Sequence, residues 1–193
     1  MLVYDLLPYK RDGKMKKLCA ALDKSVCEVE FRQQERAQLL RWVKRRFAAA
    51  GHDIDDATAD HLLFTCGSLM TELVPEIGKI AAYAKGRAVT VEDINAVADP
   101  VLDARVFDMT NSITAGKYDQ AAQVLGELLR MQTEPIVILA AVGKELRRLY
   151  TARMALDAGK DRFWLKQLWS MSSDYPAKLL MQAAGKVLSL IHI

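Results

Sequence analysis

A cluster of basic side chains between residues 41 and 46 is the feature best suited to do chemistry, because Lys and Arg neutralise phosphates. Residues 32–49 carry six basic side chains against one acidic one. The cluster predicts a face that binds nucleic acid. The alternative is the solvated side of an amphipathic helix, since an apolar stripe lies opposite and no aromatic stacking platform accompanies it. The face consists of Arg41, Lys44, Arg45 and Arg46.

A second cluster further along the chain combines arginine with tyrosine, the residue types that are enriched at binding hot spots. It predicts an interface with another protein subunit. The alternative is that the tyrosine belongs to the core while the arginines are solvated. The candidate residues are Arg147, Arg148, Tyr150 and Arg153.

The sequence contains no pattern that predicts a catalytic, cofactor or metal site. There is no GxxxxGK[ST] loop to cradle phosphates, and no serine stands in a GxSxG context. The acidic run at 53–56 lacks the glycine and distal glutamate of a calcium loop, so capping of a helix by Asp53 or Asp55 is favoured. Three scattered histidines and three widely spaced cysteines do not match a zinc site.

Composition places the chain in the cytoplasm. The odd number of cysteines fits reduced thiols, no apolar run reaches the roughly 20 residues of a membrane span, and no signal-peptide pattern begins the sequence. A net charge of +3 is too small to predict nucleic-acid binding by itself.

Residues 1–31 are predicted to form strand, helix and strand. Residues 2–7 are a short apolar run, residues 12–24 have helical spacing with Met15 and Leu18 inward, and residues 26–31 alternate with period two. One such unit cannot bury both faces of a parallel sheet. The segment is therefore interpreted as the remnant of a larger α/β domain.

Residues 33–99 are predicted to be helical, with helices over 33–50, 55–66 and 69–85 that end near glycines. Thr90 followed three residues later by Asp93 indicates a capping box. Asp99-Pro100 is the predicted domain boundary.

Residues 101–193 are predicted to form a second helical domain. Apolar residues at helical spacing, Gly116 and Pro135 define three helices between 103 and 150, and two more follow over 161–171 and 175–186. Trp164 and Trp169 are expected to be buried anchors. The tail at 187–193 is interpreted as truncated or non-native. The face predicted to be buried on the helix after Pro135 comprises Ile138, Leu139, Val142, Leu146, Leu149 and Tyr150.

Three segments resemble the delta subunit of the bacterial DNA polymerase III clamp loader. Residues 67–84 (GSLMTELVPEIGKIAAYA) are similar to the family's lid helix, and residues 89–94 (VTVEDI) to the entry of its last lid helix. The third set resembles the start of its collar domain and is the most specific: Phe107-Asp108 through Ala115-Gly116, Glu134-Pro135 with Ile138-Leu139, and Arg147-Arg148-Leu149-Tyr150.

The resemblance implies a mainly α chain with three parts: a remnant of an AAA+-like β-α-β domain (1–31), a helical lid (32–100) and a helical collar (101–193), incomplete at its C-terminal end. It implies a non-catalytic subunit that helps to load the sliding clamp onto primed DNA. The collar would contact other clamp-loader subunits, and the family's clamp-gripping residues would lie upstream of this chain. No ATP hydrolysis is expected, because Met70 stands where nucleotide-sensing AAA+ lids carry an arginine.

Two alternatives remain open at the level of the sequence. One is a fragment of a related AAA+ ATPase, which an arginine at position 70 would have favoured. The other is a free-standing helical DNA-binding module that uses the face at 41–46 and would bind DNA in a salt-dependent way.

Overall fold

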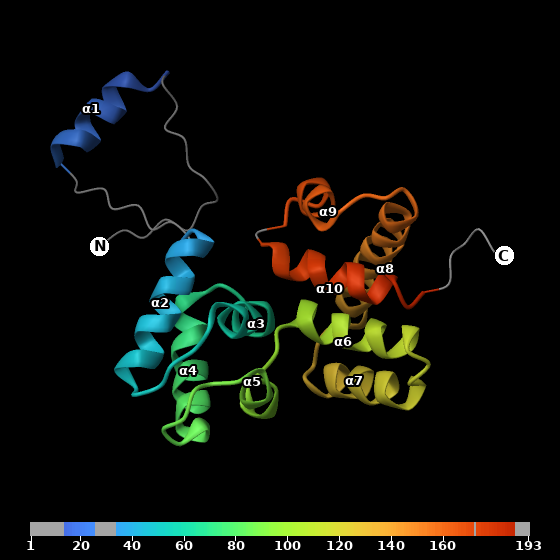
Figure 1. Ribbon diagram of the computed structural model, residues 1–193. Coiled ribbons are helices and arrows are strands. Elements are labelled where there is room, and N and C mark those ends of the chain that lie inside the picture. Colours follow the sequence, from blue (N-terminus) through green and yellow to red (C-terminus); the bar gives the residue numbers. More distant parts are fainter. Residues whose placement is uncertain (1–13, 26–33, 172, 188–193) are drawn as a thin grey trace. The chain divides into compact units, whose positions relative to one another are not determined.

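The computed structural model describes residues 14–25, 34–171 and 173–187 (Figure 1). These residues form ten α-helices and contain no strand. The mainly helical class is therefore confirmed. The two strands predicted at 2–7 and 26–31 lie outside the described residues.

The chain divides into two compact units, residues 1–33 and 34–193. The first contains α1 (Lys16–Ser25). Met15 is 56% exposed and Leu18 is 53% exposed, although both were expected to point inward.

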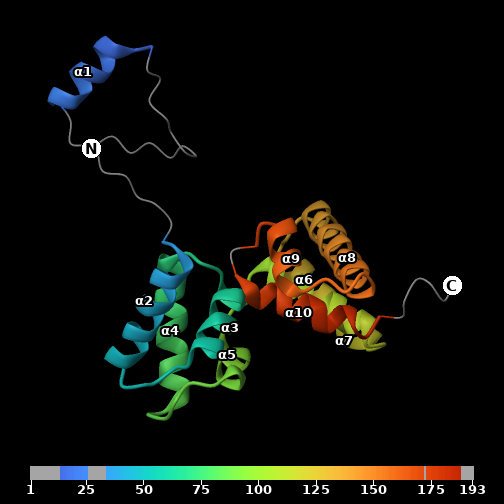
Figure 2. The same cartoon turned by 45° about the horizontal axis from the view of Figure 1, so that its top comes forward.

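The second unit begins with four helices whose ends follow the local signals in the sequence (Figures 1 and 2). Asp55 accepts a hydrogen bond from the Thr58 backbone N–H at 2.6 Å and so caps the second of them. Gly51 has a φ of 83°, a left-handed conformation that suits glycine and ends the first. The four are α2 (Arg36–Ala49), α3 (Asp56–Cys66), α4 (Met70–Ala84) and α5 (Val91–Val97).

These four helices enclose one core of apolar side chains. Phe47, Leu62 and Ile80 are completely buried, and each comes from a different helix. The positions at helical spacing in α2 and α4 that were predicted to be buried include Val43 and Leu73, which have no exposed surface. Burial of such side chains contributes about 1.5–3 kcal/mol each.

Five further helices follow, joined by short links. Gly116, with a φ of 73°, ends the first of them as predicted, and Pro135 occupies the first turn of the third. The five are α6 (Leu102–Thr114), α7 (Tyr118–Arg130), α8 (Pro135–Asp157), α9 (Arg162–Leu168) and α10 (Asp174–Ala184).

Two smaller apolar clusters hold α6–α10 together. One is shared by α6, α7 and α8 and includes Val106, Leu128 and Ile138. The other joins α8 to α9 and α10 around Leu165 and Leu180. Helix α8 therefore supplies side chains to both clusters.

The boundary predicted at residue 100 separates the core of α2–α5 from the clusters of α6–α10. Contacts nevertheless cross it, because α3 packs against both α6 and α10. The division into domains at 32–100 and 101–193 stays a prediction. Within the described ranges, no helix is long and apolar enough to cross a membrane.

Candidate functional site

The basic face predicted on α2 is partly neutralised by neighbouring carboxylates. Lys44 forms an ion pair with Asp56, and Arg46 lies over the Trp42 ring with its guanidinium carbon 5.3 Å from the ring centroid. Arg41 and Arg45 are exposed and form no ion pair with a described carboxylate. Two of the four predicted cations thus remain fully available to an external phosphate.

The predicted interface residues lie on α8 but face different surroundings. Arg147 and Tyr150 are exposed, Tyr150 to 54%. Arg148 lies over the Trp169 ring at 5.7 Å and pairs with Glu145 at 3.6 Å. Arg153 pairs with Asp157 and donates to the Val187 carbonyl at 3.2 Å. Arg147 and Tyr150 are therefore presented outward, while Arg148 and Arg153 join α8 to its neighbours.

Helix α8 also exposes an apolar stripe that the sequence reasoning placed in the core. Its buried face is narrower than predicted, since Ile138 and Leu149 are buried but Leu139 and Leu146 are 66% and 46% exposed. Apolar residues occur around most of this helix, so the sequence did not indicate which side faces the core. The exposed stripe of α8 consists of Ile136, Leu139, Leu146, Tyr150 and Met154.

Helix α7 carries an exposed apolar stripe of its own. Tyr118, Leu125 and Leu129 are spaced at helical intervals and are 68%, 39% and 48% exposed. Stripes of exposed large apolar side chains mark sites of interaction with another molecule. The geometry of α7 and α8 therefore fits docking of a protein partner better than chemistry on a small substrate.

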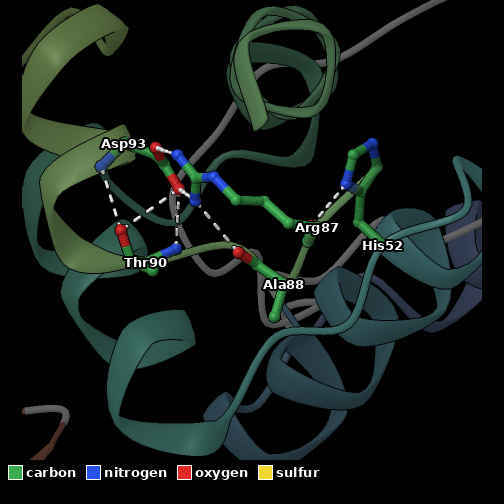
Figure 3. A network of polar contacts seen from close by, with 5 residues as sticks. All are labelled: His52, Arg87, Ala88, Thr90 and Asp93. Atoms are coloured by element: carbon green, nitrogen blue, oxygen red, sulfur yellow. Dashed lines mark hydrogen bonds and ion pairs between the residues drawn. The ribbon is translucent and has the colours of Figure 1, made fainter. Parts of the chain in front are cut away.

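A polar network fixes the loops of the α2–α5 bundle, as Figure 3 shows. The Arg87 guanidinium donates to Asp93 at 2.6 Å, and the Thr90 backbone N–H donates to the same carboxylate at 2.9 Å. His52 donates through Nδ1 to the Arg87 carbonyl at 2.8 Å. The capping box predicted at Thr90 and Asp93 is confirmed. The hydrogen bond from Arg87 holds the pKa of the Asp93 carboxyl at about 2.

A second contact group joins α3 to α10. His61 Nδ1 lies 2.9 Å from the Tyr175 hydroxyl and Nε2 lies 2.7 Å from Asn95 Oδ1. Because the amide oxygen can only accept, Nε2 carries the proton and the tyrosine donates to Nδ1. Phe64 packs edge-on against Phe107 at 5.4 Å and against Tyr175 at 5.8 Å between ring centroids. Burial raises the pKa of the Tyr175 hydroxyl above its ordinary value of 10.

Comparisons with known proteins agree with this architecture. Residues 103–189 match the family model for the DNA polymerase III delta subunit, C-terminal domain, and this range covers α6–α10. Over 93% of its length the chain is 24% identical to DNA polymerase III subunit delta of Bacillus subtilis (strain 168). Residues 103–189 thus match the C-terminal domain of the delta subunit, and the chain as a whole is similar to delta subunits.

Other delta subunits are similar at the same level. The chain is 24% identical to the subunit of Escherichia coli (strain K12) over 74% of its length. Its fold resembles a solved Bacillus subtilis DNA clamp loader delta protein with a TM-score of 0.57 and 21% identity, covering 94% of this chain. The chain spans about half the length of these relatives: 52% of the first, 43% of the second and 54% of the solved chain.

The structure locates Met70, the residue that the sequence related to ATP chemistry, outside the segment that matches the family model. Met70 begins α4, is half-buried and packs against the core of α2–α5. A thioether there supplies no positive charge to a phosphate. No group of three or more His, Cys, Asp or Glu in the described part of the chain is arranged to hold a metal ion.

Sequence reasoning missed one surface in the segment that matches the delta subunit model. Phe163 and Trp164 on α9 are 53% and 38% exposed, although Trp164 was expected to be a buried anchor. Helix α9 has seven residues and buries only Leu165. The signal was present in the sequence, because a helix of two turns cannot bury three large consecutive side chains on one face.

Proposed function

We propose that the chain is a non-catalytic part of a clamp-loader complex of the bacterial replicative DNA polymerase, and that it helps to load the sliding clamp onto primed DNA in the cytoplasm. In this proposal, residues 32–100 are a lid and residues 101–193 a collar that binds the other clamp-loader subunits. The clamp-gripping residues are expected outside residues 34–187. The chain has no catalytic site of its own and acts within the polymerase holoenzyme.

The observation that carries the proposal is the exposed apolar stripe of α8 inside the segment that matches the delta subunit model. Five large apolar side chains at helical spacing, with Arg147 beside them, form a surface of the composition found at the centre of protein interfaces. Helix α7, in the same matched segment, carries a second stripe of exposed apolar side chains. Among the described residues, no helix of this chain covers the stripe.

The test uses association with the clamp-loader ATPase subunits. The double substitution Leu146→Glu/Tyr150→Glu places two charges in the stripe, and we expect it to weaken association at least about tenfold, because an unpaired buried charge costs several kcal/mol. Both side chains are exposed, so folding is expected to be retained. Sizing chromatography of mixtures at known concentrations measures the association.

The matched control is Gln34→Glu/Gln38→Glu, which adds the same two charges to exposed positions at α2. It is expected to associate like the unaltered chain. Equal association of both double variants and the unaltered chain would contradict the assignment of the collar interface to α8.

The basic face on α2 supports a second candidate function, that of a helical module binding DNA by itself. Arg41 and Arg45 carry this hypothesis because they are exposed and form no ion pair with a described carboxylate. If it holds, Arg41→Ala/Arg45→Ala weakens binding of a duplex and lowers the slope of log K against log salt concentration by about 2. If this double substitution leaves the affinity for the duplex unchanged, the hypothesis is wrong.

A further inference from the structure

We propose that the surface between α9 and α10 binds single-stranded DNA, with Phe163 as the stacking platform and Arg162 and Lys178 as phosphate contacts. The proposal deepens the function given above, and the choice of DNA as the ligand rests on it. It assigns a ligand to a surface distinct from both the α8 stripe and the α2 basic face.

The surface is a shallow hollow of about 430 Å³. It is open to solvent, so a ligand would lie on it and would not be enclosed. The Arg162 guanidinium carbon lies 5.0 Å from the centroid of the Phe163 ring. The hollow is lined by Asp161, Arg162, Phe163, Lys178, Met181 and Gln182.

Aromatic surface and positive charge occur together here, which is the combination that single-strand binding requires. Phe163 is 53% exposed at the hollow, and Trp164, the next residue, is 38% exposed. Arg162 covers one face of the ring, and a base can stack on the guanidinium plane or on the other ring face. Every base has such a face, so this surface accepts single strands of any sequence.

The charge of this region is not neutralised from within. Residues 160–186 contain five basic and two acidic side chains, so the region carries an excess of positive charge. Asp161 accepts from the Trp164 backbone N–H at 3.0 Å as the helix cap, and Asp174 pairs with Lys166 at 2.7 Å. Arg162 and Lys178 are exposed and form no ion pair with any carboxylate that the structure describes.

The geometry of α9 and α10 does not fit binding in the major groove of duplex DNA. A helix-turn-helix protein inserts the first residues of its second helix into the major groove. In this protein Tyr175, at the start of α10, packs against α3, and Ala177 is completely buried. A flexible single strand needs only one exposed ring with cations beside it, which the hollow supplies.

Binding is measured on the full chain by fluorescence anisotropy of a labelled oligothymidylate of about 20 nucleotides, longer than the roughly 4–16 nucleotides that compact single-strand sites cover. Phe163→Leu keeps an apolar side chain but removes the ring. We expect it to weaken binding about 5- to 150-fold, the loss that removal of one base-stacking ring produces. Phe163→Trp is expected to preserve affinity.

The charge contribution is tested with Arg162→Ala/Lys178→Ala, which should lower the slope of log K against log salt concentration by about 1.4, or about 0.7 for each lost phosphate contact. The matched control, Lys16→Ala/Lys17→Ala, removes the same charge from exposed positions on α1 and should leave binding within about twofold. The proposal is overturned if Phe163→Leu binds the oligonucleotide as tightly as the unaltered chain does. It is also overturned if the two charge variants lose the same amount of affinity.

A competition with polyglutamate distinguishes DNA from an acidic protein partner. One outcome is that polyglutamate at the same charge concentration displaces the oligonucleotide equally well from the unaltered chain and from the Phe163→Leu variant. That result would show a surface that binds anions in general, and it would reject the single-strand site. The same variants distinguish failure of this proposal from failure of the proposed collar interface. Phe163→Leu should still bind the ATPase subunits, and Leu146→Glu/Tyr150→Glu should still bind the oligonucleotide.

Discussion

At the scale of single residues, the Asp93 carboxylate is the group on which the loops of the α2–α5 bundle most depend. It is 2% exposed and accepts from the Arg87 guanidinium and from the Thr90 backbone N–H (Figure 3). The sequence indicated the capping box because a threonine and an acidic residue stand three apart. It did not indicate Arg87 as a partner, because that arginine lies in the loop between α4 and α5 and its contact depends on the path of that loop.

We predict that Asp93→Asn lowers the free energy of unfolding by about 1.5–3 kcal/mol, the usual contribution of a hydrogen bond to a charged group. Chemical denaturation at neutral pH measures this change. The comparison variant is Glu92→Gln on the exposed side of the same turn, which should lower stability by less than Asp93→Asn because Glu92 is exposed. Equal losses from both substitutions would contradict the role of Asp93.

The same pair predicts a pH dependence. The folded-state pKa of Asp93 is about 2, below its ordinary value of 3.8, because Arg87 donates to the carboxylate. The stabilisation is therefore complete above the ordinary value and is lost as pH falls toward 2. Thermal unfolding between pH 5 and 2 should show a steeper loss for the unaltered chain than for Asp93→Asn.

At the scale of helices, the sequence predicted which segments are helical better than which faces are buried. Caps and left-handed glycines are local signals, and Asp55, Thr90, Gly51 and Gly116 act as they indicated. The prediction that Leu139, Leu146 and Tyr150 of α8 are buried was wrong, because all three are exposed. A helix that is apolar on two sides fits either a deep core or a core on one side and a partner on the other, and periodicity alone does not distinguish them.

Two glycines test the helix signals in opposite directions. Gly51 has a φ of 83°, so Gly51→Ala should destabilise the protein by about 1–2 kcal/mol. Gly78 lies inside α4, and an added Cβ there meets nothing within 4 Å. Gly78→Ala should therefore stabilise by roughly 1 kcal/mol, the difference in helix propensity. Denaturant midpoints measure both, and effects of the same sign would contradict the assigned ends of α2 and α4.

At the scale of the whole helical unit, the contacts around His61 and Tyr175 connect α3 with α10 across the predicted domain boundary. These residues are separated by 114 positions in the sequence. No local pattern relates residues so far apart, so the contact was not predicted. The face predicted on α2 and the hollow at α9 illustrate the same limit, because neutralisation by Asp56 and exposure of Phe163 depend on packing between helices.

We predict that His61 and Tyr175 are energetically coupled. In a double-mutant cycle with His61→Ala and Tyr175→Phe, the combined loss of stability should differ from the sum of the single losses by about 0.5–2 kcal/mol. Tyr175→Phe keeps the ring packed against Phe64, so the cycle isolates the hydroxyl. Urea denaturation supplies the four free energies. Additivity within about 0.3 kcal/mol would show that this contact does not couple the two helices.

The central claim is that the exposed side of α7 and α8 is the surface that other clamp-loader subunits cover. Hydrogen–deuterium exchange of the chain, with and without the ATPase subunits, tests it most directly. The proposal predicts slower exchange in peptides from residues 118–157 on addition of the subunits, with α2 unchanged. Protection confined to α2, or no protection of residues 118–157 in a mixture that forms a complex, would contradict it.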